Sequence, residues 1–349
     1  MTKAVVAAVK PCLVELVAGR TYFWCACGRS SKQPYCDGSH KGTGIEPLAF
    51  KAEENGDALL CACKRTRGGP WCDGSHNALS DSYGEPMDAA TDAETVTFVE
   101  TPEGARAQLD SDCFVLRPGS GKQFGRLRMQ QTIGPGDGAK HISQFAGQLE
   151  AGTSPVLRFA GSDAALFIVS GTGKIEIGAR SFDLAAHSGA YVRASEAFRL
   201  IADSGQPFVF NISVCPLGPM PEILDDMPAG FDTSVPIRIV PLDPAKRSAM
   251  ADRFYQVLVD GEHHGTQVTQ FIGHIPLSRA AHHHHLYEET LLVLSGDGIM
   301  WTDRTKAALK AGDVIFLPRK QSHSVECTSP EGMLLVGVFY PSMSPAINY

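Results

Sequence analysis

The stretch Cys25-Ala-Cys27…Pro34-Tyr-Cys36-Asp-Gly-Ser-His40 decides how the first part of this chain folds. It recurs 36 residues later as Cys61-Ala-Cys63…Pro70-Trp-Cys72-Asp-Gly-Ser-His76. Cysteine thiolates and neutral imidazoles are common metal ligands. Three thiols and one imidazole, repeated at identical spacing, therefore indicate two metal centres.

Each copy reads C-x-C-x2-[ST]-x3-P-x-C-D-G-S-H, with Ser30 and Thr66 at the hydroxyl position. The pattern resembles the CDGSH iron–sulfur domain over roughly residues 10–78. The resemblance implies a [2Fe–2S] cluster in each copy and a pseudo-two-fold unit within one chain. It also assigns the cluster ligands. In the first cluster Cys25 and Cys27 would bind one iron, and Cys36 and His40 the other. In the second cluster Cys61 and Cys63 would bind one iron, and Cys72 and His76 the other.

Structural zinc is the alternative, because a Cys3His set also suits tetrahedral Zn. Zinc modules usually separate paired cysteines by two to four residues, and here one residue intervenes, which favours iron–sulfur. A histidine ligand raises the cluster potential relative to an all-thiolate cluster. Protonation of His40 or His76 would weaken its iron bond, so we expect the clusters to be labile in acid.

Composition and charge narrow the function classes. A chain of 349 residues suffices for two or three domains, and a hydrophobic content of 43% is ordinary for a buried core. The net charge is −7, yet residues 1–80 carry ten Lys/Arg against seven Asp/Glu. The acidic excess in the rest argues against a nucleic-acid partner.

Six of the ten cysteines belong to the repeated motif, and the others stand singly at Cys12, Cys113, Cys215 and Cys327. This pattern favours a reducing compartment over a disulfide framework. Lys10, Pro11 and Glu15 interrupt the apolar run near the start, which is too short for a signal peptide or a spanning helix. We therefore expect a soluble cytoplasmic protein with no membrane partner.

The later part of the chain contains short β-rich runs separated by Gly, Pro and Asp: Leu166–Val169, Phe208–Val214, Gln267–Ile272, Leu291–Leu294, Val314–Leu317 and Leu334–Phe339. Many short strands with turn residues between them predict a β-sandwich or barrel. Two of these runs repeat at an offset of about 125 residues, which predicts two copies of one barrel.

The expected fold class is mainly β, with a small tandem iron–sulfur module followed by two β-barrels. The predicted domains are the module at 1–80, an acidic linker at 81–110 with one short strand at Thr95–Val99, a first barrel at 111–216, a Pro-rich connector at 217–245 and a second barrel at 246–349.

The second barrel contains Ala281-His-His-His-His285-Leu-Tyr-Glu-Glu289, followed by Gly296, and later Gly312-Asp-Val-Ile-Phe-Leu-Pro318 before His323. These stretches resemble the two cupin motifs, G-x5-H-x-H-x3,4-E-x6-G and G-x5-P-x-G-x2-H-x3-N. The resemblance implies jelly-roll barrels. Mapped by the fixed gaps, it assigns four metal ligands: His283, His285, Glu289 and His323.

Strand geometry supports that assignment, because alternate residues share a face. Mixed N/O ligands suit one divalent metal, Fe first, with Mn, Ni, Cu or Zn as alternatives. A competing register uses His282 with His284 and Glu288, but the gap from Glu288 to Gly296 is then one residue longer than the cupin motif allows. Four consecutive histidines also occur in solvated loops and expression tags.

The chain departs from the cupin pattern at Leu277, Lys320 and Cys327. Cys327 shares a strand face with His323, where its thiol either tunes the site or fills space. The first barrel lacks the ligand set, and the expected positions hold Arg158, Ala160 and Ala164. The region therefore resembles a bicupin with one degenerate half, and bicupins usually pair edge to edge, so we expect a homodimer.

The two kinds of metal centre lead to the main hypothesis, a non-haem iron oxygenase (an oxidoreductase, such as a dioxygenase) acting on a small organic molecule. A reductase or ferredoxin would supply electrons, which the two [2Fe–2S] clusters would relay to iron in the cupin. Glu289 would also be catalytic, as a proton shuttle. Tyr287 and Trp301 are candidates for the pocket lining or for core packing. The analogy is with the design of Rieske oxygenases and not with their fold.

Two alternatives remain open. The cupin can be a Mn- or Zn-dependent isomerase, decarboxylase or hydrolase whose clusters act as a redox switch. The chain can also be a non-enzymatic redox or small-molecule sensor, although it has no DNA-binding motif. The identity of the barrel metal distinguishes the two enzyme hypotheses.

Overall fold

Short antiparallel strands form most of the chain, as the computed structural model shows for residues 3–53, 55–66, 69–72, 75–79, 92–250, 252–280 and 282–345. Helix within these residues is limited to α1 (Gly261–His264) and to 3-10 turns at Ser75–Leu79, Pro135–Asp137 and Pro244–Lys246. The predicted mainly-β class is confirmed. The chain divides into two compact units, whose main segments are Met1–Met87 and Asp88–His282 with Tyr287–Met343.

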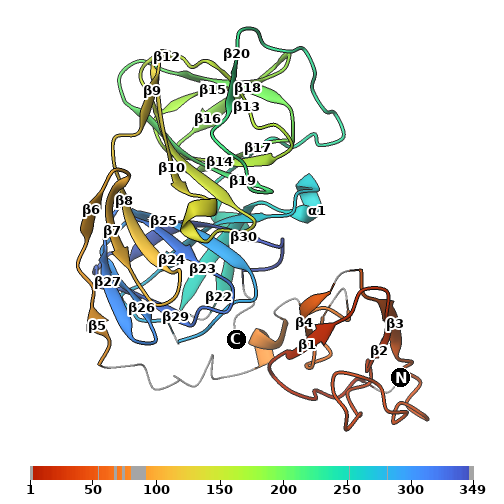
Figure 1. The fold of residues 1–349 in the computed structure, drawn as a ribbon. Coiled ribbons are helices and arrows are strands. Elements are labelled where there is room, and N and C mark those ends of the chain that lie inside the picture. Colours follow the sequence, from red (N-terminus) through yellow and green to blue (C-terminus); the bar gives the residue numbers. More distant parts are fainter. Residues whose placement is uncertain are drawn as a thin grey trace. The chain divides into compact units, whose positions relative to one another are not determined.

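The N-terminal unit contains two small antiparallel sheets (Figure 1). One pairs β1 (Cys12–Leu16) with β4 (Gly56–Leu60), and the other pairs β2 (Thr21–Trp24) with β3 (Leu48–Lys51). At the 36-residue spacing of the motif, β3 corresponds to β1 and β4 to β2. Each sheet therefore takes one strand from each copy.

The core of this unit is small, and metal-ligand cysteines are part of it. Trp24, Leu60, Cys61 and Cys63 form one buried cluster. A domain of this size buries little apolar surface, so bound metal commonly supplies part of its folding free energy.

The larger unit consists of two β-sandwiches, each built from two sheets (Figure 1). In the first sandwich a seven-stranded sheet has the order β21 (Ile239–Pro241), β17 (Ser188–Val192), β14 (Asp163–Ser170), β19 (Phe208–Cys215), β11 (Ser143–Leu149), β10 (Leu127–Ile133), β9 (Lys122–Phe124). The facing sheet has the order β16 (Arg180–Ala185), β15 (Thr172–Ile177), β18 (Ala197–Ala202), β13 (Val156–Arg158), β20 (Glu222–Leu224), with β12 (Gly152–Thr153) beside β18.

The second sandwich has a nine-stranded sheet in the order β22 (Ser248–Met250), β23 (Arg253–Val259), β24 (Thr269–Ile275), β30 (Met333–Tyr340), β25 (Glu288–Ser295), β28 (Val314–Leu317), β8 (Phe114–Pro118), β7 (Gly104–Gln108), β6 (Val99–Thr101). The facing sheet has the order β29 (His323–Cys327), β26 (Gly298–Thr302), β27 (Thr305–Leu309), β5 (Glu94–Thr95).

The structure differs from the expected domain boundaries at two places. Residues 81–91 lie outside the described residues, but the rest of the predicted linker forms β5, β6 and β7, and β8 pairs with β28 of the second sandwich. The predicted connector contributes β20 and β21 to the first sandwich. Both differences have one cause: strand pairing is non-local, and no local pattern shows which sheet a short strand joins.

The two large sheets pack face to face and bury residues of both sandwiches. Phe114 and Phe316 lie in this interface with Phe167 of β14 and Ile133 of β10. Each strand alternates between this interface and its own sandwich core. On β25, Leu292 faces the interface, whereas Leu291 and Val293 face the core of the second sandwich.

Candidate metal centres

The first motif copy holds its four predicted ligands in two close pairs. The Sγ atoms of Cys25 and Cys27 are 3.7 Å apart, and Cys36 Sγ is 3.2 Å from His40 Nδ1. Two backbone hydrogen bonds bring the pairs to one site: Cys25 N donates to Pro34 O and Cys36 N to Phe23 O, both at 2.8 Å. The second half of the motif is thereby fastened to the end of β2.

The second copy repeats this arrangement. Cys61 Sγ and Cys63 Sγ are 3.5 Å apart, and Cys72 Sγ is 3.4 Å from His76 Nδ1. Cys61 N donates to Pro70 O, and Cys72 N donates to Leu59 O. The structure thus brings all eight predicted cluster ligands into pairs, one Cys/Cys pair and one Cys/His pair in each copy.

The pair geometry fits two metal ions per copy better than one. A tetrahedral ion with bonds of about 2.3 Å to sulfur and about 2.0 Å to nitrogen keeps its ligand atoms roughly 3.5–3.8 Å apart, and each pair is near this range. A single zinc ion would bring all four ligand atoms within that distance. Among the described residues, neither Cys/His set contains three ligand atoms within 4.8 Å of one another. Two separate pairs are what a two-iron cluster requires.

Side chains between the ligands have identifiable roles in the loop. The hydroxyl of Ser30 donates to Tyr35 O at 2.6 Å, and that of Thr66 donates to Trp71 O at 2.8 Å. Asp37 accepts hydrogen bonds from Ser39 N and from both Ser31 N and Ser31 Oγ, which hold the pKa of its carboxyl well below the ordinary value. These contacts fix the backbone on both sides of the third cysteine.

Hydrogen bonds also favour the ligand form of the first cysteine. Burial raises the pKa of Cys25, but hydrogen bonds from Ser30 N, from Cys27 and from Gln33 outweigh it, so the pKa is lowered. A lowered thiol pKa favours the thiolate that binds iron.

Three histidines of the second sandwich form a separate group. The possible ligand atoms of His283, His285 and His323 all lie within 4.8 Å of one another. His283 and His285 precede β25, and their rings are nearly perpendicular, with centroids 4.7 Å apart. His323 is the first residue of β29. Three imidazoles at this separation fit one divalent ion.

A backbone contact sets the tautomer of His323. Its Nδ1 lies 2.8 Å from Gln321 O, a carbonyl that can only accept, so Nδ1 carries the proton and Nε2 is left as the donor atom for a metal. Sequence reasoning missed Gln321 because the contact uses its backbone, which leaves no signal in residue type.

Glu289 is buried on β25, with 4% of its surface exposed. It has the same strand parity as Leu291 and Val293, so it faces the core of the second sandwich. Burial raises the pKa of its carboxyl to about 8. Within the described part of the chain, the three-histidine group does not include Glu289. Its roles as fourth ligand and proton shuttle stay predictions.

The competing ligand register is disfavoured by contacts of two of its members. His282 Nε2 lies 2.9 Å from Asp303 Oδ1. Glu288 has the parity of Leu292 and faces the first sandwich, where its carboxylate accepts hydrogen bonds from the backbone nitrogens of Lys140, His141 and Ile142. Both side chains are thus engaged elsewhere.

Three other candidates behave as packing residues. Cys327 lies in the core of the second sandwich, which supports the space-filling interpretation. Tyr287 stacks on Phe339 with ring centroids 4.3 Å apart. Trp301 lies between Arg279 and Lys306 and donates to Glu326, so it does not share the face of the core residue Met300.

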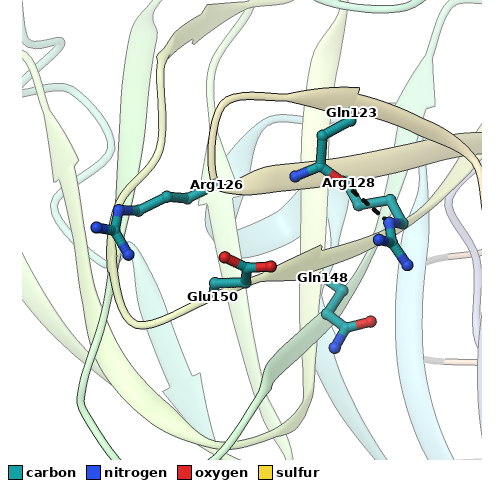
Figure 2. Close-up of a pocket in the computed structure, with 5 residues that line it drawn as sticks. All are labelled: Gln123, Arg126, Arg128, Gln148 and Glu150. Atoms are coloured by element: carbon teal, nitrogen blue, oxygen red, sulfur yellow. Dashed lines mark hydrogen bonds between the residues drawn. The ribbon is translucent and has the colours of Figure 1, made fainter.

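The first sandwich offers no comparable ligand set at the equivalent positions. Arg158 binds the carboxylate of Glu222 at 2.7 Å, and the interior is filled by apolar side chains that include Phe145, Phe198 and Phe210. A shallow surface pocket of this sandwich is lined by none of the predicted ligands (Figure 2); its residues are Gln123, Arg126, Arg128, Gln148 and Glu150.

Two family matches agree with the two kinds of site. Residues 7–41 match the family described as iron-binding zinc finger CDGSH type, and residues 275–339 match the family described as cupin domain. The human CDGSH iron-sulfur domain-containing protein 3, mitochondrial, is 63% identical over 54 residues, which cover 15% of this chain and 42% of the human protein. The chain thus spans less than half the length of that relative.

Solved structures resemble the larger unit. The putative glyoxylate-induced protein from Pseudomonas aeruginosa has a TM-score of 0.53 at 15% identity, covering 74% of this chain and 96% of that one. Oxalate decarboxylase from Bacillus subtilis has a TM-score of 0.50 at 12% identity, covering 74% of this chain and 81% of that one. At these identities the likeness shows the fold alone.

Fold and ligand geometry together define a mainly β protein with candidate metal ligands in its N-terminal unit and in its C-terminal region. More specifically, the chain carries a CDGSH iron–sulfur domain near its N-terminus and a cupin domain in its C-terminal region. The CDGSH domain implies an iron–sulfur cluster, and the three histidines indicate a cupin metal. The second CDGSH copy and the cupin character of the first sandwich remain predictions, supported by the repeated geometry.

Two further properties bear on the expectations from the sequence. In the part of the chain that the structure describes, no helix has the length and apolar character needed to cross a membrane. None of the ten cysteines, all of which are among the described residues, forms a disulfide. The cytoplasmic location remains a prediction.

Proposed function

We propose that the protein is a cupin oxygenase that uses a mononuclear iron and draws electrons from two [2Fe–2S] clusters of its own chain. The carrying observation is the group of His283, His285 and His323 in a chain that also pairs eight cluster ligands. A metal that needs no electrons has no evident use for attached clusters.

The ligand chemistry supports iron at the three imidazoles. Imidazole nitrogen suits iron, copper, nickel and zinc, and a site with few protein ligands leaves coordination positions open. Iron bound there would supply a redox-active centre for O2 and substrate. The chain itself orients His323 through Gln321 O and excludes water from His285 and His323, which are 7% and 3% exposed.

The number of electrons that the proposed reaction consumes also supports the presence of two clusters. Inserting one atom of O2 into a C–H bond and releasing the other as water consumes two electrons and two protons. Two reduced clusters hold one electron each, and a reductase or ferredoxin would reload them. In the metal-free site burial raises the pKa of Glu289 to about 8, which makes its carboxyl a candidate for one proton source.

The substrate is a small organic molecule, and a second copy of this chain is the expected partner in a homodimer. Both belong to the proposal. They rest on the cupin fold and on the analogy with the design of Rieske oxygenases.

The test combines metal analysis with single turnover. The purified full-length protein should hold about five irons per chain, four in clusters and one in the cupin, each with a distinct EPR signal after anaerobic reduction. Exposure to O2 should reoxidise the clusters together with product formation. H323A should hold the clusters but not transfer electrons to O2, and H282A is the matched control.

Manganese or zinc at the three histidines, with clusters that stay reduced in O2, would overturn the oxygenase proposal. That result would favour a non-redox isomerase, decarboxylase or hydrolase with the clusters as a switch. Ligand binding without turnover would favour a sensor.

A further inference from the structure

Lys64 follows the second cysteine of the second motif copy, and its side chain is buried. The residue is 8% exposed. Its Nζ donates to Cys61 O at 2.8 Å and lies 4.6 Å from the centre of the Trp24 ring. The π face of an indole attracts a cation, and the carbonyl fixes its position. A positive charge is therefore held in place inside the unit.

The charge lies between ligands of both motif copies. Trp24 directly precedes Cys25, and its Nε1 donates to the same Cys61 carbonyl at 2.8 Å. Trp24 adjoins Cys25 in the chain and Lys64 adjoins Cys63, so the ammonium lies beside ligands of both copies.

The backbone of Lys64 indicates that the side chain matters. Its φ is +60°, in the left-handed region that favours glycine. The equivalent residue of the first copy is Gly28, with φ +79°, and a Cβ there would lie 1.8 Å from Val5 O. Glycine is required in the first copy. In the second copy glycine would suit the backbone better, yet the position carries a lysine.

We propose that Lys64 is a positioning residue shared by the two clusters, whose fixed positive charge raises the reduction potentials of both. Reduction adds one electron to a cluster and makes it more negative, so a nearby cation stabilises the reduced form. Net charge around a cluster and hydrogen bonds are the main protein controls on its potential. Little solvent screens a buried charge.

This inference rests on the presence of the two clusters and not on the oxygenase reaction. An electrostatic role for Lys64 and a purely structural role predict different measurements. Loss of a hydrogen bond to Cys61 O would lower stability, but only loss of the charge would shift the potential of the first cluster, whose ligands belong to the other motif copy.

The experiment is a spectroelectrochemical titration of the full-length, cluster-loaded protein. K64M removes the charge, K64R keeps it, and K51M is the control because Lys51 is exposed. Each is measured alone and in a C72S background, which removes a ligand of the second cluster and leaves the first to be read. We expect K64M to lower both potentials by about 59 mV, a tenfold change in the one-electron equilibrium constant. K64R and K51M should remain near the wild-type values.

Unchanged potentials in loaded K64M, or an unchanged first-cluster potential in K64M/C72S, would overturn the proposal. If K64M does not retain its clusters, K64G is the neutral variant to use, because glycine suits the left-handed backbone at this position. Failure of the oxygenase proposal would appear as absent turnover in the wild type and would leave these potentials interpretable.

Discussion

The carboxylate of Glu288 lies 2.8 Å from the backbone nitrogen of Ile142, in the buried interface between the two sandwiches. It accepts two more hydrogen bonds, from Lys140 N and His141 N. Its neighbour Glu289 has the opposite strand parity and faces the core in which the cupin motif predicts a metal. Two adjacent glutamates thus face opposite sides of the sheet, Glu288 the interface between the sandwiches and Glu289 the core of the second sandwich.

E288A should lower the free energy of unfolding without loss of metal. The buried N–H of Ile142 and the partly buried N–H groups of Lys140 and His141 would lose their acceptor, and each unsatisfied buried donor costs about 1–3 kcal/mol. We expect a loss of about 3 kcal/mol or more in denaturant unfolding, with the metal content per folded chain unchanged. Loss of the cupin metal from folded E288A would instead support the competing register.

Glu289 should make the metal-free protein less stable as the pH rises. In the unfolded chain its carboxyl loses a proton near the ordinary value of 4.5, whereas burial keeps the folded carboxyl protonated up to a pKa of about 8. Between these values the folded state binds more protons, so the free energy of unfolding falls with rising pH. The chelated wild type should match E289Q at pH 5 and be less stable at pH 8.5. Equal pH profiles for the two proteins would contradict this.

H323A should lose the cupin metal, and H282A should keep it. His323 belongs to the three-histidine group and is oriented by Gln321 O, whereas His282 binds Asp303. Second-shell changes alone typically cost 10–100-fold in metal affinity, so loss of a ligand should exceed about 100-fold. Competition with a chelator measures both affinities, and equal losses would refute the assignment.

Replacing the cluster histidines should remove acid lability. His40 and His76 each pair with a cysteine at 3.2 Å and 3.4 Å, and protonated imidazole cannot bind iron. H40C/H76C should keep its visible absorbance at pH 5.5, where the wild type bleaches, and should have a lower reduction potential. Bleaching of both proteins at the same rate would show that another group controls the loss.

A165S should stabilise the larger unit. Gln144 donates to Thr290 Oγ1 at 3.0 Å across the interface. The strand registers of the two sandwiches repeat about 125 residues apart. By that offset Gln270 of the second sandwich corresponds to Gln144 of the first, and Ala165 of the first corresponds to Thr290 of the second. Among the residues that the structure describes, the buried amide of Gln270 has no hydrogen-bond partner. A hydroxyl at position 165 should pair with it and add about 1 kcal/mol, visible as a raised Tm. A lowered Tm would mean that the added atom overpacks the interface.

Much of this organisation could be predicted from the sequence, because the informative signals were local. The motif from Cys25 to His40 indicated the ligand pairs through its family resemblance, and the apolar runs predicted β14, β19, β28 and β30 within three residues. The choice of His283 and His285 over their neighbours followed from the fixed gaps of the cupin motif, although both residues precede β25 and do not lie on a strand.

The rest depended on non-local contacts. The expected strand Thr95–Val99 became β5 and β6, which join sheets completed by strands about 200 residues later. The partner of Glu288 is a set of backbone amides, which have no sequence signature. The contact of Lys64 with Trp24 required the exchange of strands between motif copies.

The pairing of β8 with β28 has a consequence for biogenesis. As the chain leaves the ribosome, β5–β8 emerge first and must wait, with an open edge, until the entire first sandwich has been synthesised. Exposed strand edges promote aggregation in such intervals. A recombinant fragment of the metal-binding sandwich that starts at residue 246 would lack these strands, and one that starts near residue 92 would retain them.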